Sequence, residues 1–359
     1  MKVLYKIISR ILLLTVVVFL CNFAYRKTLW KEDLKTTGAE LLEQIIHAQD
    51  SADVIYFAES SNWSTHEKDT IKKSISEFTS EYYPGLVFRS VQKGAIHAGV
   101  YVPLIKRIRK GARVKTIVVT LNLRSFNANW IHSKLETPLM RANLAYEQRP
   151  AVLSRFLMSL NAYDNRSEKQ RDEDLMEQWR KDQLMFPYPF QYSSIIEWDR
   201  AMGNGTYLKT DGTWDMPKIE LACSYVKTYA FQIDTLTNPR IKDFDRIVKI
   251  CKEKNLNLVF NLMAENVQYA DSLVGKDLVY LIHQNRDLLM ARYNKDDVTV
   301  VDNLELVDGK LYIDQNWTTE HYMQVGRQTI ANNLAEHLRK IYPEKYSPLV
   351  VIKTNSKLP

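Results

Sequence analysis

Short apolar segments rich in strand-forming residues alternate with segments of helical periodicity along most of this chain. The expected strands cover residues 53–58, 86–91, 114–121, 256–262 and 298–301. The expected helices cover residues 37–48, 64–83, 99–109, 241–254, 271–292 and 320–341. Strands that alternate with helices form a parallel sheet that is covered on both faces. We therefore expect an α/β protein with a doubly wound parallel sheet.

The middle of the chain departs from this alternation. No strand pattern occurs from about residue 125 to 216, where the segments 150–160 and 167–185 have helical periodicity and 186–192 is rich in aromatic residues and proline. We expect a largely helical insertion with aromatic-rich turns. The expected organisation is a membrane-anchoring segment over 1–33, one α/β domain over 34–345 that contains the insertion, and a tail over 346–359.

The longest apolar run lies near the N-terminus. Residues 11–24 are uncharged, and the basic residues Lys2, Lys6 and Arg10 precede them. Counted from Ile7, with Arg10 reaching toward the headgroups, the run approaches the roughly 20 residues that a transmembrane helix needs. The basic flank favours a cytoplasmic N-terminus, although three further basic residues follow the run and weaken the asymmetry.

Two other targeting signals fit this run less well. Residues 22–25 lack the small-x-small pattern of a signal-peptide cleavage site, and Leu20 stands where a lipoprotein signal has a small residue before Cys21. We expect an uncleaved signal anchor, with cleavage as the alternative. Both place the rest of the chain outside the cytoplasm, and the expected location is a single-pass protein of the inner membrane with its α/β domain on the periplasmic side.

Composition and motifs argue against several functional classes. The 45% hydrophobic and 25% charged fractions are those of a globular protein, and the net charge of +7 is spread without a basic block, which gives no case for nucleic acid. No phosphate loop or dinucleotide fingerprint occurs, and His97 and His132 lack metal-ligand spacing, so neither cofactor nor metal is implied. Cys223 and Cys251 are expected to be buried free thiols.

Two short motifs carry candidate chemistry. Ser60 follows the first expected strand and precedes a helix, and ligands of open α/β sheets bind at the carboxyl ends of strands. His321 follows the last strand, in the first turn of the expected closing helix, and Asp314 lies in the loop before it. A serine nucleophile needs a base, which is commonly a histidine oriented by a carboxylate. Ser61 is an adjacent rival nucleophile.

The order of these features resembles the SGNH (GDSL-type) hydrolase superfamily. The family carries Gly-Asp-Ser after the first strand, where this chain has Ala-Glu-Ser over 58–60. Gly99, with Gly94 as a second candidate, stands for the glycine that opens the helix after the second strand. Asn122 stands for the asparagine of Gly-x-Asn after the third strand.

The last family block is Asp-x-x-His followed by a glycine, and His321 and Gly326 have its spacing. Thr318 occupies the position of the family's aspartate, so the acid is Asp314, Glu320 or another residue, or is absent. The resemblance implies a flavodoxin-like three-layer fold in which Ser60 attacks an ester carbonyl and His321 takes its proton. It also implies an oxyanion hole made by the Ser60 N–H, the Gly99 N–H and the Asn122 side chain.

Anchored relatives of this kind act on polysaccharides, which sets the expected function. The resemblance implies an extracytoplasmic serine esterase or O-acyltransferase acting on acyl esters, acetyl above all, of cell-envelope or exported polysaccharide, with a membrane acyltransferase as a partner in the case of transfer. The alternative is a catalytically inactive carbohydrate-binding or scaffold protein. Aromatic residues of the insertion are candidates for stacking on sugar rings, or else pack in the ordinary way: Trp179, Tyr188, Tyr192 and Trp198.

Overall fold

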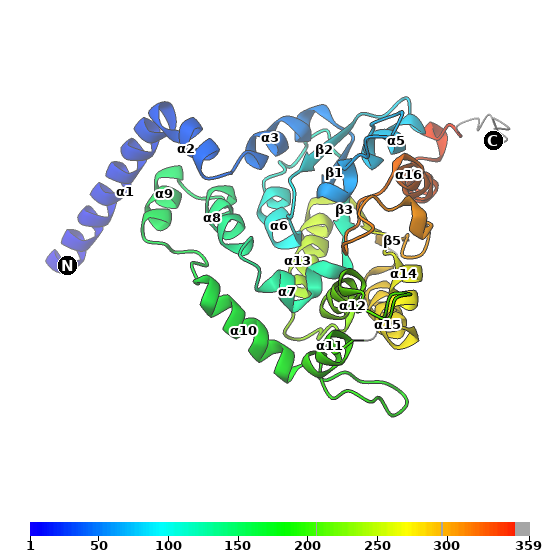
Figure 1. Ribbon diagram of the computed structural model, residues 1–359. Coiled ribbons are helices and arrows are strands. Elements are labelled where there is room, and N and C mark those ends of the chain that lie inside the picture. The colour runs from blue at the N-terminus through cyan, green and yellow to red at the C-terminus, as the bar shows by residue number, and fades with distance from the viewer. Residues whose placement is uncertain (206, 296, 349–359) are drawn as a thin grey trace.

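The computed structural model describes residues 1–205, 207–295 and 297–348 (Figure 1). Its centre is one sheet of five parallel strands in the order β2-β1-β3-β4-β5. In chain order the strands are β1 Val54–Ala58, β2 Phe88–Gln92, β3 Thr116–Leu121, β4 Asn257–Leu262 and β5 Val298–Asp302. The expected α/β architecture with a parallel sheet is therefore confirmed. Most of the expected tail, residues 349–359, lies outside the described residues.

The burial of each strand follows its place in the sheet. Every residue of the inner strands β1 and β3 is buried, whereas β2 at the edge is mostly half-buried. Val54 is in register with both Phe88 and Thr116, so the three strands end close to one another. The segments that follow β1 and β3 therefore leave the sheet at the same carboxyl edge.

Helices cover both faces of the sheet, each with its own apolar cluster. One face carries α3 Leu41–Ser51, α6 Ala98–Lys106, α13 Pro239–Lys254 and α15 Lys276–Tyr293. The opposite face carries α5 Ile75–Glu81 and α16 Gln324–Leu338 (Figure 1). Alternate residues of β1 point into the two clusters, which is why an uninterrupted apolar run forms this strand.

The middle of the chain is helical, as expected. It contains α7 Ala128–Ile131, α8 Glu136–Tyr146, α9 Ala151–Ser159, α10 Glu168–Lys181, α11 Ile195–Gly203 and α12 Met216–Tyr229. Within the described part of 125–216, the only strand-like pairing is an isolated bridge between Leu208 and Trp214.

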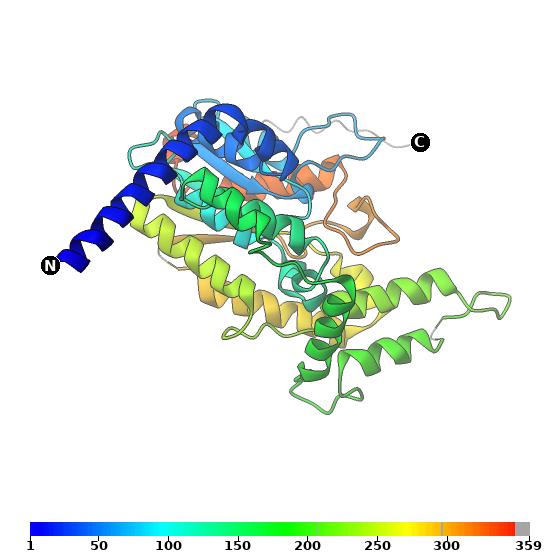
Figure 2. The same cartoon turned by 90° about the vertical axis from the view of Figure 1, so that its left-hand side faces the viewer.

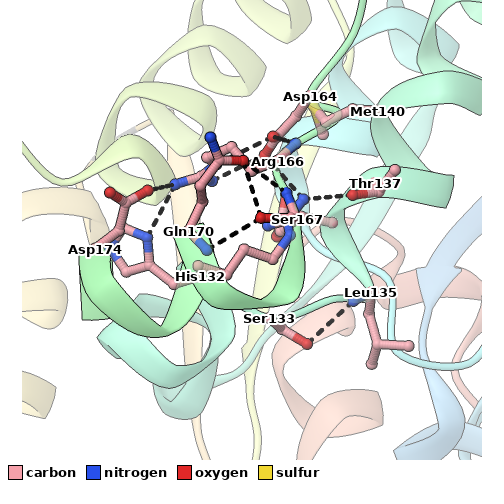
Figure 3. Close-up of polar contacts among 12 residues, drawn as sticks. His132, Ser133, Leu135, Thr137, Met140, Asp164, Arg166, Ser167, Gln170 and Asp174 are labelled. Carbon is pink, nitrogen blue, oxygen red and sulfur yellow. Dashed lines mark hydrogen bonds and ion pairs between the residues drawn. The ribbon is translucent and has the colours of Figure 1, made fainter. Parts of the chain in front are cut away.

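Ion pairs join the start of α10 to the loop before it, and Arg166 also contacts His132 at the end of α7 (Figure 3). Arg166 pairs with Asp164 at 2.8 Å and also with Asp174, and its guanidinium lies 3.2 Å from His132 Nδ1. Arg171 lies 3.2 Å from Asp164. The long charged helix α10 thus has a solvated face and an anchored N-terminal end.

The helix expected over 64–83 is much shorter. Helix α5 begins after Ser74, ten residues beyond the expected start, and a capping box marks its N-terminus: the Ser74 side chain accepts from the Glu77 N–H and the Glu77 side chain accepts from the Ser74 N–H. Residues 64–73 instead wrap around the fully buried guanidinium of Arg327. That group donates hydrogen bonds to carbonyl oxygens of 64 and 73 and pairs with Asp69 at 2.9 Å. Satisfying this buried cation outweighs the local helical pattern.

The helix expected over 271–292 is two helices. Helix α14 covers Val267–Leu273, and α15 begins after Gly275, which has a φ of 108°. A side chain at this φ is strained, so glycine marks the break.

The N-terminal run forms a helix of its own. Helix α1, Lys2–Thr28, is long and apolar enough to span a membrane, and the short helix α2, Trp30–Thr36, follows it. Helix α1 has no buried residue and projects away from the sheet in both views (Figures 1 and 2). Of the cysteines, Cys251 is buried and Cys223 half-buried, and both are free thiols.

Candidate active site

Ser60, His321 and Asp314 form a hydrogen-bonded chain. Ser60 Oγ lies 3.0 Å from His321 Nε2, and His321 Nδ1 lies 2.7 Å from Asp314 Oδ2. With the proton on Nδ1, the imidazole donates to the carboxylate and accepts from the serine hydroxyl, so both bonds are satisfied at once. All three side chains are partly exposed, which leaves the serine accessible. This arrangement can activate an oxygen nucleophile.

Ser60 owes its position to the end of β1. It is the first residue of the short helix α4, Ser60–Trp63, and only Glu59 separates it from the strand. The neighbouring Asn62 is fully buried and donates to Gln92 Oε1 at 2.9 Å, which ties the turn to the end of β2. Ser61 points inward and is 1% exposed, so the rival nucleophile is not presented at the surface.

His321 and Asp314 share a closed loop between β5 and α16. His321 does not lie in the closing helix, which begins three residues later, so that expectation was wrong. Tyr312 and Tyr322 form an antiparallel bridge, and the N–H of Ile313 donates to the carbonyl of His321 at 2.8 Å. The Thr319 hydroxyl donates to Asp314 Oδ2 at 2.5 Å. The loop therefore holds acid and base together.

The geometry distinguishes among the acids that the sequence left open. Asp314 is the carboxylate beside His321, whereas Glu320 pairs with Arg124 on the buried side of the loop. Thr318, which stands at the family's aspartate position, is buried with its hydroxyl 3.3 Å from that of Thr228. The acid lies seven residues before the histidine instead of three.

The two candidate oxyanion residues are engaged elsewhere. The Gly99 N–H donates to His97 Nδ1 at 3.1 Å and is therefore not directed at Ser60. A Cβ at Gly99 would lie 2.6 Å from Asp243 Oδ2, so this glycine permits close packing of α6 on α13. The Asn122 side chain donates to Glu59 Oε1 at 2.8 Å. Their role in an oxyanion hole stays a prediction.

Three buried carboxyl groups lie behind the Ser–His–Asp chain. Glu59, Glu265 and Glu320 are each at most 9% exposed, and a single guanidinium, that of Arg124, donates to both oxygens of Glu320. Burial raises the pKa of the Glu59 carboxyl to about 8, and the negative charge of Glu320 adds to this effect. Burial likewise raises the pKa of Glu265 well above its ordinary value. No pattern in the sequence indicates this cluster, because its members are far apart in the chain.

Replacing Glu59 with Gln is expected to flatten the pH dependence of stability. The folded pKa of about 8 exceeds the ordinary value of 4.5, so between these limits folded Glu59 holds a proton that the unfolded chain releases. Its contribution to stability is therefore fully present below pH 4.5 and is lost as pH rises toward 8. As pH rises across this window, the free energy of unfolding of the variant should fall less steeply than that of the unmodified protein, by up to about 1.4 kcal/mol per pH unit. Urea unfolding at pH 5, 6, 7 and 8 checks this, and parallel curves would contradict it.

A cleft of about 880 Å³ opens beside the His321 loop. Its aromatic walls are Trp130 and Trp317, the latter 61% exposed. Thr318 belongs to its lining and to the His321 loop, and Trp130 also lines a small hollow that contains Glu59 and Asn122. Ser60, His321 and Asp314 do not line the cleft itself, and Thr318 and Trp130 are the residues that connect it to the His321 loop and to the hollow beside Glu59.

Of the four aromatic candidates for sugar stacking, Trp179, Tyr192 and Trp198 pack within the insertion, whereas Tyr188 is 44% exposed and contacts α15. Trp179 and Trp198 are 7% and 2% exposed. Tyr192 stacks on Trp198 with ring centroids 5.9 Å apart, and the Tyr188 hydroxyl donates to Asp277 at 2.7 Å. Sequence reasoning missed Trp130 and Trp317, although Trp317 stands only four residues before His321.

Among the described residues, no three His, Cys, Asp or Glu side chains are grouped so that they could hold a metal ion. His97 is buried with its Nε2 3.2 Å from Glu136 Oε1, and burial together with the nearby Arg240 lowers its pKa to about 4.

No model of a known protein family matches the chain, and a search of curated proteins found no similar sequence. The geometry of the site therefore carries the functional argument.

Proposed function

We propose that this protein is an SGNH-like serine esterase or O-acyltransferase, anchored in the inner membrane with its α/β domain on the periplasmic side. The observation that carries the proposal is the chain from Ser60 to His321 to Asp314, with distances of 3.0 and 2.7 Å. The strand order β2-β1-β3-β4-β5 supports it, because it is the flavodoxin-like doubly wound order. The site lies at the carboxyl edge, where such sheets bind ligands.

In the proposed reaction, Ser60 Oγ attacks the carbonyl carbon of an acyl ester while His321 Nε2 takes the hydroxyl proton. Asp314 stabilises the imidazolium that forms. Collapse of the tetrahedral intermediate breaks the ester bond, and the departing sugar oxygen takes the proton from His321. Water completes hydrolysis of the acyl-serine, whereas a second sugar hydroxyl completes transfer.

The negative oxygen of the intermediate needs hydrogen-bond donors. The Ser60 N–H is in the first turn of α4, where an N–H has no acceptor within the helix. The Asn122 amide has two N–H groups, and its bond to Glu59 uses one of them. These two groups are the proposed donors, without a contribution from Gly99.

The cleft beside the site supports a carbohydrate as the group that carries the ester. Trp130 and Trp317 offer aromatic faces on which sugar rings stack, and the largely apolar lining also includes polar and charged side chains. Its charges nearly cancel: Asp199 and Lys227 are 3.8 Å apart, and Arg200 and Glu220 also line the cleft. The remaining charged lining residue, Arg124, is paired with Glu320. This balance favours a glycan without high charge. Acetyl is the proposed acyl group, and a membrane acyltransferase is the proposed partner if the reaction is transfer.

Labelling with a serine-reactive phosphonate tests the proposed nucleophile. We expect one adduct per chain, mapped by mass spectrometry to Ser60 and absent from the Ser60→Ala and His321→Ala variants. Ser61→Ala is the matched control, and it should label as the unmodified protein does. An adduct on Ser61, or labelling that survives His321→Ala, would refute the proposed pair. Acetate release and acetyl transfer from an acetylated oligosaccharide then distinguish hydrolysis from transfer.

A second candidate function is a catalytically inactive carbohydrate-binding or scaffold protein. The engagement of the Gly99 N–H with His97 favours it, because one donor implied by the family resemblance is missing. This candidate predicts a folded protein that binds acetylated glycan but forms no phosphonate adduct.

A further inference from the structure

Helix α9 exposes an apolar stripe. Leu153, Phe156 and Leu160 are 40%, 56% and 60% exposed and share one face, because they are spaced by three and four residues. The opposite face, which includes Ser154 and Met158, is buried. Helix α9 is thus amphipathic with its apolar side outward, which costs free energy in water.

This stripe belongs to a helix that packs against α1 (Figure 1). The N–H of Val152 donates to the Asn22 side chain at 3.3 Å, and Arg155 lies 3.4 Å from Asp33 of α2. Asn22 is within two turns of the C-terminal end of α1, which is the end nearest the α/β domain. If α1 spans a bilayer, α9 must therefore lie where that bilayer meets water.

The charges around α9 suit the surface of a membrane. Arg26 and Lys27 end α1, Lys31 follows on α2, and all three are exposed. Arg155 lies on the side of α9 away from the apolar stripe, as expected for a helix in the plane of the interface. Basic side chains at this level reach lipid headgroups while apolar ones enter the acyl region.

We propose that α9 is an interfacial helix, which inserts Leu153, Phe156 and Leu160 into the bilayer that α1 spans. The helix thereby gives the α/β domain a second attachment and a fixed orientation on the membrane. The proposal does not depend on the chemistry of the Ser60 site.

Photo-crosslinking in proteoliposomes tests the proposal with the full chain. The vesicles contain phosphatidylcholine and phosphatidylglycerol with a small fraction of phosphatidylcholine that carries a diazirine in its acyl chain. After illumination, peptide mapping should find lipid adducts on α1 and on Leu153, Phe156 and Leu160. The peptide containing Leu236, which is 81% exposed but outside α9, is the internal control and should carry at least tenfold fewer adducts. Adducts confined to α1 would overturn the proposal.

A pair of variants separates insertion from simple proximity. Phe156→Asp combined with Leu160→Asp should remove the α9 adducts while those on α1 persist. Ser159→Asp, which places the same charge in the same turn but off the stripe, should retain them. Circular dichroism establishes that each variant is folded. If α9 adducts in the unmodified protein fall as the ratio of protein to lipid rises, a second copy of the chain covers the stripe, and the lipid proposal is wrong.

Discussion

Replacing Asp314 with Asn is expected to lower kcat/KM for a chromogenic acetyl ester by roughly 10⁴-fold, with a folded protein. The amide still fits between Thr319 and His321, but it cannot stabilise the imidazolium, and it favours the wrong imidazole tautomer. Ser60→Ala and His321→Ala should each cost at least as much, because a triad acts as a unit and its losses are not additive.

Two matched variants make this result specific. Ser61→Ala should keep kcat/KM within severalfold of the unmodified protein, because Ser61 is buried away from the imidazole. A Glu320→Gln variant tests the other acid that the sequence left open. If Asp314→Asn retained activity and Glu320→Gln abolished it, the assignment of the acid to Asp314 would be wrong.

Replacing Arg124 with Met is expected to destabilise the fold by about 3–5 kcal/mol, since it leaves the Glu320 carboxylate buried without its partner. Arg124 bonds both oxygens of Glu320 and also the carbonyl oxygen of Thr318, which fixes the segment directly before His321. Urea unfolding at pH 7 measures the loss. Activity per folded molecule should fall as well, because the segment that carries His321 is no longer fixed by Arg124.

The double variant Arg124→Met with Glu320→Leu is the control for this pair. With both charges removed, much of the lost stability should return, since the remaining buried groups no longer include an unpaired ion. If the double variant were as unstable as the sum of the two single variants, the energetic coupling of Arg124 and Glu320 would be absent. The pair would then be a structural coincidence.

Most of the fold was predictable because strand signals are local. The run 116–121 contains only aliphatic residues and threonine, and it forms a strand that is buried along its whole length. The ends of helices were predicted less well where contacts with a residue distant in the sequence determine where the helix begins. Residues 64–73 were expected to be helical but surround Arg327, a residue whose burial no local pattern reveals.

In the candidate site too, residues with a local sequence signal were predicted and contacts between distant residues were not. Ser60 was predicted from the strand end that precedes it, His321 from its place at the expected closing helix, and Asp314 from its position in the loop just before His321. The buried partners Glu59, Arg124 and Glu320 were not recognised as a group, since Arg124 and Glu320 are 196 positions apart in the sequence. Trp130 and Trp317 were missed because aromatic spacing alone does not distinguish a cleft wall from packing.

The bridge between Tyr312 and Tyr322 has a consequence for how the proposed activity would be lost on unfolding. Asp314 and His321 are seven residues apart within a loop that closes on itself, whereas Ser60 is 261 residues from His321. Because closing a short loop costs little entropy, the effective concentration of Asp314 at His321 stays high even when the sheet is partly unfolded. The serine has no such tether. Partial unfolding should therefore separate an isolated nucleophile from an intact acid–base pair, so inactivation precedes the loss of the His–Asp hydrogen bond.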